Sequence, residues 1–283
     1  MDKRDRHFMT SFIATVTGFY LLFTLGLFVF QRSMLYFPDT SVPELEASGI
    51  GDMEAVMLKT SDGLGLLSWY RRAAPGRPTM VYFHGNAGNI ESRGFKVRPY
   101  LESGLGLLLV GYRGYGGNPG KPSEEGLYRD GRAALAFLAA DGVPADHWVL
   151  YGESLGTGIA VQLAGERARE SPVGALVLEA SYTSIAEVAG HHYPFVPTGL
   201  LVRDRFDSAA KIARVGAPVF VFHGERDRTI PIRFGKDLFE AAVEPKESLW
   251  LKGASHNDLY EYGASRGVLD FLGRHFGQAV DGG

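Results

Sequence analysis

The stretch His147–Gly158 constrains the fold of this chain more than any other part of the sequence. Its apolar run Trp148–Tyr151 predicts a buried strand that stops at Gly152, and Thr157–Arg169 carries apolar residues at helical spacing. Between the two lies the pentapeptide Gly-Glu-Ser-Leu-Gly at 152–156. This G-x-S-x-G pattern, set directly between a strand and a helix, is typical of a tight turn that exposes a serine side chain.

Ser154 lies at the centre of this turn. A serine there has a strained backbone, and side chains two positions away on either side would collide with the turn. Glycine at positions 152 and 156 removes the collision and leaves the serine Oγ exposed at the carboxyl end of the strand. The N-terminus of the following helix points at the site and favours developing negative charge. An ordinary strand-to-helix turn is the alternative, and the flanking strand and helix favour a nucleophile.

The composition fits one large folded domain with a short additional segment. The chain has 283 residues, of which 45% are hydrophobic and 22% charged. A formal net charge of -3 gives no reason to expect a nucleic acid as partner. The absence of cysteine excludes disulfides, thiolate zinc sites and cysteine nucleophiles, and it is compatible with any redox compartment.

The first residues form a separate segment. Phe8–Phe30 is an uncharged run of 23 residues, long enough to cross a hydrocarbon core of roughly 30 Å. A cleaved signal peptide would have a shorter apolar region ending in small residues, whereas Leu27–Arg32 offers no such cleavage site. We therefore expect an uncleaved signal anchor at 1–32, spanning the membrane with residues 8–30. Residues 33–52 are expected to be a linker, and 53–283 the catalytic domain.

Basic residues near this span predict its orientation. Lys3, Arg4 and Arg6 precede the apolar run, whereas only Arg32 follows it closely and the next basic residue is Lys59. Because the more basic flank tends to stay in the cytoplasm, the rest of the chain is expected on the non-cytoplasmic side of the membrane. In the linker, the apolar run Met34-Leu-Tyr-Phe37 is expected either at the membrane interface or packed on the domain.

Strands and helices alternate along the rest of the chain. The first two strand-like runs flank Thr60–Gly63, a plausible hairpin turn, and Ser123–Ala140 is an example of helical spacing. Continuous apolar strands alternating with helices predict a parallel sheet covered on both faces, and such sheets bind ligands beyond the carboxyl ends of their strands, where Ser154 falls. The expected strands are Met53–Lys59, Leu64–Arg71, Thr79–Phe83, Leu105–Gly111, His147–Tyr151, Ala175–Leu178, Pro218–Phe222 and Ser248–Leu251.

A serine nucleophile needs a base and an acid that orients the base. Asp227 follows the Pro218 strand and is the preferred acid, with Glu225 as the alternative two residues away. His256 follows the Ser248 strand, is expected to open the final helix, and is the candidate base. The chain order of Ser154, Asp227 and His256 is the order typical of this strand-to-helix serine turn. A surface histidine at a helix start and a turn-stabilising aspartate are the alternatives for each position alone.

A glycine-rich turn, His84–Asn89, follows the Thr79 strand. Such a turn lets backbone N–H groups face the site. The N–H of Asn86, together with that of Leu155, is therefore the candidate oxyanion hole for a tetrahedral intermediate. A simple Gly/Asn turn is the alternative.

The chain resembles the alpha/beta-hydrolase superfamily, and within it the membrane-anchored branch with a single N-terminal span. The resemblance covers roughly residues 34–276 and implies an eight-stranded, mostly parallel sheet, a Ser154–His256–Asp227 triad, and activity on esters or thioesters, often lipidic, without a cofactor. It does not identify the substrate. The motifs that carry it are Phe83-His-Gly-Asn-Ala-Gly-Asn89, Gly111-Tyr-Arg-Gly-Tyr-Gly116, Pro122-Ser-Glu-Glu-Gly-Leu-Tyr128, Gly152-Glu-Ser-Leu-Gly156 and His256.

Other patterns are weaker. The pair Gly114 and Gly116 is followed by Pro119 where a dinucleotide site needs a third glycine, and His191–His192 lacks matching metal-ligand spacing. No cofactor or metal is therefore expected. The aromatic stretch Tyr182–Phe206 interrupts the sheet pattern and is either a short cap over the site or ordinary packing.

The sequence thus predicts a membrane-anchored serine hydrolase that cleaves ester or thioester bonds of a small-molecule or lipid acyl substrate through an acyl-enzyme. Two alternatives remain. A serine aminopeptidase-type enzyme would need an acidic subsite for the substrate ammonium, and none is evident in the sequence. An inactive hydrolase fold could serve as a membrane-tethered binding module, although an intact nucleophile, base and acid argue against that reading.

Overall fold

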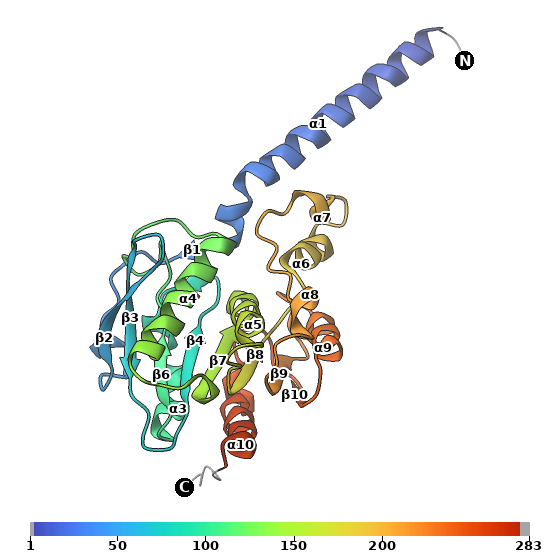
Figure 1. The fold of residues 1–283 in the computed structure, drawn as a ribbon. Coiled ribbons are helices and arrows are strands. Elements are labelled where there is room, and N and C mark those ends of the chain that lie inside the picture. Colours follow the sequence, from blue (N-terminus) through green and yellow to red (C-terminus); the bar gives the residue numbers. More distant parts are fainter. Residues whose placement is uncertain (1–2, 278–283) are drawn as a thin grey trace.

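Eight strands form one twisted sheet at the centre of the molecule, in a computed structural model that describes residues 3–277 (Figure 1). Their order across the sheet is β10-β9-β8-β7-β4-β6-β3-β2. The strands β4 and β6–β10 run parallel, and β3 pairs antiparallel with both β2 and β6. The bounds are Glu54–Lys59 (β2), Gly65–Arg71 (β3), Thr79–Phe83 (β4), Gly106–Leu109 (β6), Trp148–Glu153 (β7), Ala175–Glu179 (β8), Val219–Gly224 (β9) and Lys246–Leu251 (β10).

Helices cover both faces of the sheet and bury two apolar layers. Strands β4, β6 and β8 are buried throughout, and β7 is buried except at its last residue, Glu153, which explains their continuous apolar sequences. One layer lies under α3 and α10, and the other under α4, α5, α8 and α9. These helices are Gly94–Glu102 (α3), Glu124–Ala140 (α4), Leu155–Arg167 (α5), Ala209–Ile212 (α8), Ile232–Ala241 (α9) and Ala264–Phe276 (α10). The predicted α/β fold class is confirmed.

Several boundaries differ from the sequence prediction by one or more residues, and those beside the candidate site matter most. Strand β7 does not stop at Gly152, because Gly152 and Glu153 continue the ladder with β8. Helix α5 begins at Leu155, directly after Ser154. His256 does not open the final helix: it lies in a loop, followed by a short 3-10 turn at Leu259–Tyr262 and only then by α10.

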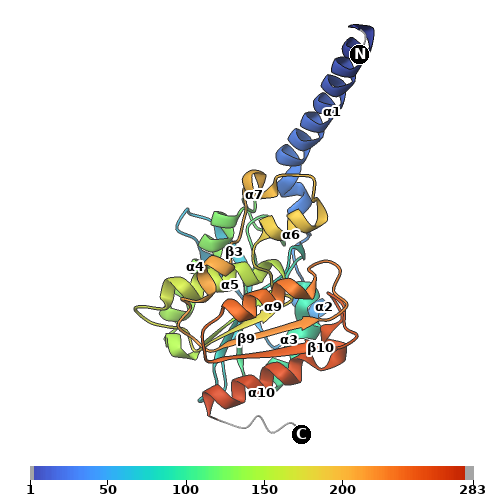
Figure 2. The ribbon, with the colours of Figure 1, turned by 90° about the vertical axis from the view of Figure 1, so that its right-hand side faces the viewer.

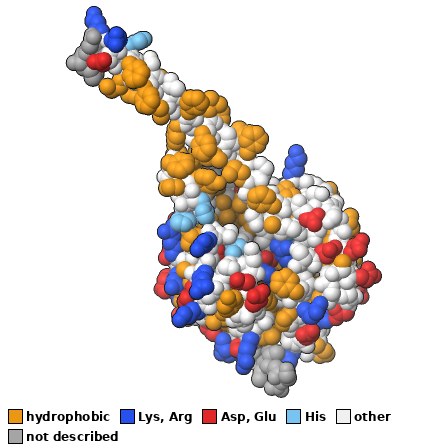
Figure 3. Space-filling model, turned by 180° about the vertical axis from the view of Figure 1, so that it is seen from behind, with side chains coloured by type: hydrophobic (Ala, Val, Ile, Leu, Met, Phe, Trp, Pro, Cys, Tyr) orange, Lys and Arg blue, Asp and Glu red, His pale blue; other side chains and the backbone are white. Residues whose placement is uncertain are grey.

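The N-terminal helix α1, Lys3–Leu35, is one continuous rod that projects from the domain (Figure 1). Its apolar side chains form a continuous exposed band, whereas charged side chains are scattered over the domain (Figure 3). Its length and hydropathy suffice to cross a membrane, which an uncleaved anchor and a signal sequence would both satisfy. Since α1 is uninterrupted to Leu35, it extends past the predicted end of the span.

Residues 33–52, the expected linker, contact the domain at several points. Tyr36 is buried in the core, and Phe37–Pro38 (β1) pairs with Ala87–Gly88 (β5). Helix α2, Leu45–Ser48, is followed by the buried Ile50. Of the expected apolar belt, Met34 and Phe37 are exposed, Leu35 is half-buried and Tyr36 is buried, so the belt divides between the surface and the core.

The aromatic stretch after β8 forms a small separate layer beside α1. It contains two short helices, α6 (Ile185–His192) and α7 (Thr198–Leu201). In Figures 1 and 2 both helices lie next to the lower part of α1, at the end of the molecule opposite α10. We refer to residues 182–206 as the cap segment.

Candidate active site

Ser154 occupies a strained turn between β7 and α5. Its backbone has φ 49° and ψ -114°, a conformation that residues with a side chain rarely adopt. A Cβ atom at Gly152 would lie 2.5 Å from Thr157 Cα, and one at Gly156 would lie 2.0 Å from the carbonyl oxygen of Phe83. Both glycines are therefore required by close backbone approach, as the sequence pattern predicts.

The structure brings Ser154, His256 and Asp227 together in one hydrogen-bonded chain. His256 Nε2 lies 3.1 Å from Ser154 Oγ, and His256 Nδ1 lies 2.6 Å from Asp227 Oδ2. Because a carboxylate only accepts hydrogen bonds, Nδ1 carries the proton, which leaves Nε2 free to accept one from the serine hydroxyl. The three side chains come from the ends of three strands, β7, β9 and β10.

The turn that carries Asp227 is pressed against the turn that carries His256. The N–H of Arg226 donates to the carbonyl oxygen of Ala254 at 2.9 Å. A Cβ atom at Gly224, the last residue of β9, would lie 2.5 Å from the same Ala254 oxygen. Since β9 and β10 are parallel neighbours in the sheet, this contact fixes the distance between the candidate acid and base.

Asp227 is held as a carboxylate. Its Oδ1 accepts from the backbone N–H groups of Thr229 and Ile230, both at 2.8 Å. Its Oδ2 faces His256 and also His223, whose Nε2 is 3.1 Å away. Burial alone would raise the pKa of Asp227, but hydrogen bonds from His223 and His256 outweigh it and hold that pKa well below the usual range. The side chain therefore stays ionised at neutral pH.

Glu225, the alternative acid, occupies a different position. It is exposed to solvent, whereas Asp227 is buried. Within residues 3–277 the Glu225 carboxylate makes no hydrogen bond to His256. The geometry thus favours Asp227 as the group that can orient the imidazole.

Two backbone donors flank the serine. The N–H of Leu155 opens helix α5, and the N–H of Asn86 lies in the turn after β4. Within residues 3–277 neither N–H donates a hydrogen bond to another group of the chain, so both remain available to a substrate oxygen. The Asn86 carbonyl accepts from Tyr115 Oη at 2.8 Å and from the Phe37 N–H at 2.9 Å, which holds the next peptide, Asn86–Ala87, and the carbonyl oxygen of Gly85, in the same peptide as the Asn86 N–H, lies 2.8 Å from His84 Nδ1.

The end of α1 is bonded to the same turn. Asn86 Nδ2 donates to the carbonyl oxygen of Leu35, the last residue of α1, at 2.9 Å. His84, two residues earlier, is fully buried and stacks on Tyr112 with ring centroids 4.0 Å apart. Burial lowers the pKa of His84 to about 3, so the ring is neutral at physiological pH and acts as a packing group. The N-terminal helix and the candidate oxyanion turn thus form one rigid unit.

A buried ionic cluster lies next to the serine turn and contacts Glu153, the residue before Ser154. Lys96 Nζ, on α3, lies 2.9 Å from Glu153 Oε1 and 2.7 Å from Glu179 Oε1. Arg93 Nε lies 3.0 Å from Glu153 Oε2 and its Nη2 donates to the carbonyl oxygen of Ala87, beside Asn86. Because leaving one buried charge unpaired typically costs about 3–5 kcal/mol, the cluster strongly favours this one arrangement.

The cluster connects three of the four turns of the site, those that carry Ser154, Asn86 and His256. Glu153 directly precedes Ser154, whose N–H donates to the Glu179 carbonyl oxygen at 2.8 Å. Tyr151 Oη bonds both Glu179 Oε2 and Tyr260 Oη, and Tyr260 belongs to the short turn after His256. The charges of Lys96 and Arg93 outweigh burial and hold the pKa of Glu153 below its usual range, whereas burial raises the pKa of Glu179.

The sequence prediction did not single out His223 or the ionic cluster. His223 stands four residues before Asp227 at the end of β9, a position that signals proximity only once the strand and turn are known. Its Nε2 also lies 2.8 Å from the Ile230 carbonyl oxygen, so Nε2 carries a proton. A Cβ at Gly235 would lie 2.4 Å from His223 Nδ1, which shows how closely α9 packs on this ring.

Comparisons with known proteins identify the family of this chain. Residues 78–207 match the family described as alpha/beta hydrolase fold. An uncharacterized protein of Mycobacterium tuberculosis is 39% identical over 231 residues, which cover 81% of each chain. Human alpha/beta hydrolase domain-containing protein 17B is 33% identical over 214 residues, covering 75% of this chain and 72% of the human protein. This chain belongs to the alpha/beta-hydrolase superfamily.

Solved structures of other alpha/beta hydrolases share the fold at low sequence identity. An esterase from Pyrococcus furiosus superposes with a TM-score of 0.67 at 16% identity, covering 85% of this chain and 99% of the esterase. An esterase from Exiguobacterium antarcticum gives a TM-score of 0.61 at 15% identity, covering 77% and 99%. At such identities the likeness concerns the fold, and the activity of this alpha/beta hydrolase has to be argued from its own side chains.

Proposed function

We propose that this alpha/beta hydrolase is a membrane-anchored serine hydrolase that cleaves carboxylic ester or thioester bonds through an acyl-enzyme. The observation that carries the proposal is the hydrogen-bonded chain from Ser154 through His256 to the buried Asp227, set at a strained turn. A strained serine backbone persists only where the surrounding structure enforces it, and such positions cluster at active sites. An inactive binding module has no need of that strain.

The proposed reaction uses only groups of this chain. Ser154 Oγ attacks the acyl carbonyl while His256 Nε2 takes its proton, and Asp227 stabilises the resulting imidazolium. The N–H groups of Asn86 and Leu155 donate to the oxyanion of the tetrahedral intermediate. His256 then gives its proton to the leaving alcohol or thiol, and water repeats the cycle on the acyl-enzyme. None of these steps needs a cofactor.

A lipid or other acyl substrate suits the surroundings of the site better than a peptide. The α1 helix, with its exposed apolar band, ends at the turn that carries Asn86. An aminopeptidase-type enzyme would need a carboxylate that is free to bind the substrate ammonium. Instead, Asp227 is bonded to His256, and the carboxylates of Glu153 and Glu179 beside the serine turn are both paired with Lys96.

A fluorophosphonate probe tests the proposed activity, because it reacts covalently with an activated serine but not with an ordinary surface hydroxyl. The purified full-length protein is expected to be labelled, with the modified peptide containing Ser154, and to hydrolyse a panel of short esters and thioesters. A protein that is folded yet neither labelled nor hydrolytic would favour the binding-module alternative.

The proposed anchor also predicts a membrane orientation. We expect α1 to remain uncleaved and the catalytic domain to lie on the non-cytoplasmic side, because three basic residues precede the span and Arg32 alone follows it closely. Alkaline phosphatase fused after Gly283 should then be active and green fluorescent protein at the same site should be dark. A bright fluorescent fusion with inactive phosphatase would place Ser154 in the cytoplasm and direct the substrate search to acyl-proteins and lipids there.

A further inference from the structure

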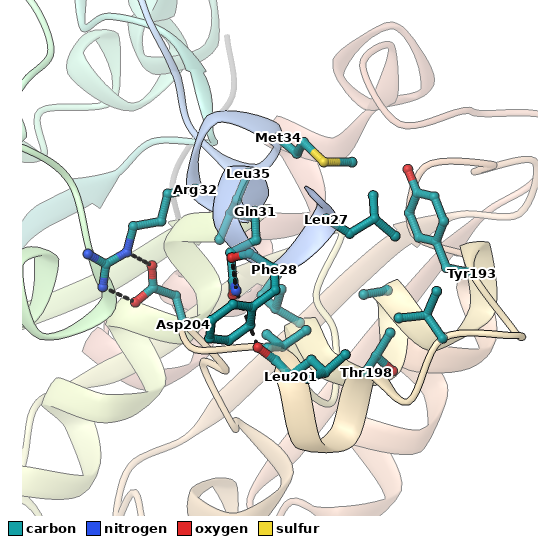
Figure 4. A pocket seen from close by; sticks show the side chains of 14 residues that line it. Leu27, Phe28, Gln31, Arg32, Met34, Leu35, Tyr193, Thr198, Leu201 and Asp204 are labelled. Atoms are coloured by element: carbon teal, nitrogen blue, oxygen red, sulfur yellow. Dashed lines mark hydrogen bonds and ion pairs between the residues drawn. The ribbon is translucent and has the colours of Figure 1, made fainter. Parts of the chain in front are cut away.

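An apolar pocket lies between the lower part of α1 and the cap segment (Figure 4). Its cavity volume is about 180 Å³, and its walls are mostly aliphatic and aromatic. Leu27, Phe28 and Leu35 come from α1, whereas Ile185, Ala189 and Leu201 come from the cap segment. A helix long and apolar enough to cross a membrane thus supplies one wall of a cavity in the catalytic domain.

Polar contacts fix the two walls relative to each other at the base of the pocket. Arg32 donates to Asp204 through Nε at 2.8 Å and Nη2 at 3.0 Å. Gln31 donates to the carbonyl oxygen of Leu201 at 3.2 Å and accepts from the N–H of Arg203 at 2.8 Å. Figure 4 shows that Arg32 bonds the Asp204 carboxylate and that Gln31 bonds backbone groups, so their polar atoms are already paired. The pocket is therefore preformed.

The cap segment also follows α1 into its apolar stretch. Tyr20 Oη donates to the carbonyl oxygen of Phe195 at 2.8 Å, and the Phe195 ring lies 6.2 Å from that of Phe23. From Gln31 to Tyr20 the helix rises roughly 16 Å, about half the thickness of a hydrocarbon core. Phe195, in the loop after α6, is 60% exposed, and Leu200, in α7, is 88% exposed, so both extend the apolar surface of α1 onto the cap segment.

The hydrogen bond from Tyr20 to Phe195 is explained if the part of the cap segment around Phe195 lies in lipid. A peptide carbonyl in the hydrocarbon region has no water to bond and must find a partner in the protein. The Tyr20 hydroxyl, on the apolar helix, supplies that partner to Phe195. The exposed side chains of Phe195 and Leu200 would then face acyl chains instead of water.

The pocket adjoins the candidate catalytic loops on two sides. On the α1 side, Leu35 is bonded through its carbonyl oxygen to the side chain of Asn86. On the cap side, helix α6 ends at His192, whose Nε2 lies 3.0 Å from the carbonyl oxygen of Thr229 in the turn of the candidate acid. Hydrogen bonds thus link α1, which forms one wall of the pocket, to the oxyanion turn, and α6, which contributes to the other wall, to the Asp227 turn.

We propose that the cap tip, residues 193–201, is immersed in the lipid leaflet beside α1, and that the pocket receives the acyl chain of a long-chain ester lipid directly from that leaflet. This inference rests on the proposed function. Pockets that enclose a whole drug-sized ligand measure about 300–1,000 Å³, so a cavity of about 180 Å³ holds only part of a long chain. The remainder of the chain stays in the bilayer, which selects membrane lipids over water-soluble esters.

The occupancy of the pocket is tested with Ala189→Trp, which fills the cavity from α6, and with the matched control Ala136→Trp on the exposed face of α4. Full-length protein in phosphatidylcholine vesicles is assayed with an embedded long-chain umbelliferyl ester and with p-nitrophenyl acetate. Ala189→Trp should lower the ratio of long-chain to acetate kcat/KM by about tenfold or more, since each excluded methylene costs binding energy. Ala136→Trp should leave the ratio unchanged.

An unchanged ratio in Ala189→Trp would overturn the pocket assignment. Ala189→Leu, a smaller filler that is more readily accommodated, should lower the ratio in the same direction, so loss of folding in the tryptophan variant does not end the test. Wild-type protein that hydrolyses neither ester and takes up no fluorophosphonate would instead refute the proposed function. The two failures are therefore distinguishable.

The position of the cap tip is tested independently of activity. Because the chain contains no cysteine, Leu200→Cys can carry a single environment-sensitive nitrobenzoxadiazole label. Val243→Cys is the matched control: it is 59% exposed, but it precedes β10 at the amino ends of the strands, away from α1. In vesicles the Leu200→Cys label should be quenched by a lipid-borne nitroxide, and the Val243→Cys label by aqueous iodide. Iodide quenching at both positions would overturn the immersion of the cap tip.

Discussion

Replacement of Ser154 by alanine is expected to abolish hydrolysis of a short p-nitrophenyl ester while the fold stays intact. The Oγ atom is the proposed nucleophile, and the loss of a member of such a triad typically lowers kcat by factors of about 10⁴–10⁶. Alanine has the same Cβ atom as serine, so the backbone strain at φ 49° is the same in both proteins. The free energy of unfolding should therefore change little.

The measurement compares ester hydrolysis and thermal unfolding of the purified full-length wild type and Ser154→Ala. Ser248→Ala, an exposed serine on the edge strand β10, is the matched control and should retain the wild-type rate. If Ser154→Ala kept more than roughly a tenth of the wild-type rate, the assignment of the nucleophile would be wrong, since triad losses are far larger.

Much of this fold was predictable because buried parallel strands leave a direct trace in the sequence. Thr79–Phe83 is buried at every position, so its side chains form a continuous apolar run with the same bounds as β4. The prediction for β7 ended too early at Gly152 for a related reason. Side-chain pattern marks the end of an apolar run, whereas the backbone ladder with β8 continues through Gly152 and Glu153 regardless of their side chains.

The candidate triad was predictable for a topological reason. Parallel strands bring their carboxyl ends to one edge, so polar residues directly after Tyr151, Phe222 and Leu251 had to lie near one another. The structure brings Ser154 and His256 within hydrogen-bonding distance accordingly.

The buried ionic cluster left no such trace. Lysine and glutamate are rarely buried unless they are paired, so the sequence alone would place Lys96 and Glu179 at the surface. Their pairing becomes visible only when α3 is placed over β7 and β8. The contact of the cap segment with α1 could not be predicted from the sequence either. Nothing near Phe195 in the sequence indicates Tyr20, which lies far away in the chain.

Exchange of Asp227 for asparagine is expected to lower activity far more than exchange of Glu225 for glutamine. Only the Asp227 carboxylate reaches the imidazole, at 2.6 Å from His256 Nδ1, whereas Glu225 is exposed. An uncharged amide can no longer stabilise the imidazolium, and a mis-set histidine tautomer has cost about 10⁴ in kcat in a comparable triad.

The hydrogen-bond partners of Asp227 determine why Asp227→Asn loses activity. Two backbone N–H groups, of Thr229 and Ile230, donate to Oδ1, so the amide oxygen of the asparagine must take that position. The NH₂ group of the asparagine then takes the place of Oδ2 and faces His256 Nδ1. Because an NH₂ group donates hydrogen bonds, Nδ1 must lose its own proton in order to accept one. The proton moves to Nε2, and Nε2 can no longer accept from Ser154 Oγ.

The pH dependence of kcat/KM separates this tautomer effect from simple unfolding. A wrongly protonated imidazole can regain activity at high pH, where direct loss of a serine proton replaces general-base catalysis, whereas an unfolded protein cannot. We therefore expect Asp227→Asn to be less stable than the wild type but folded at the assay temperature, and to show a rate that rises into the alkaline range, whereas Glu225→Gln should keep the wild-type profile. The reverse order of effects would transfer the orienting role to Glu225 and leave Ser154 and His256 in theirs.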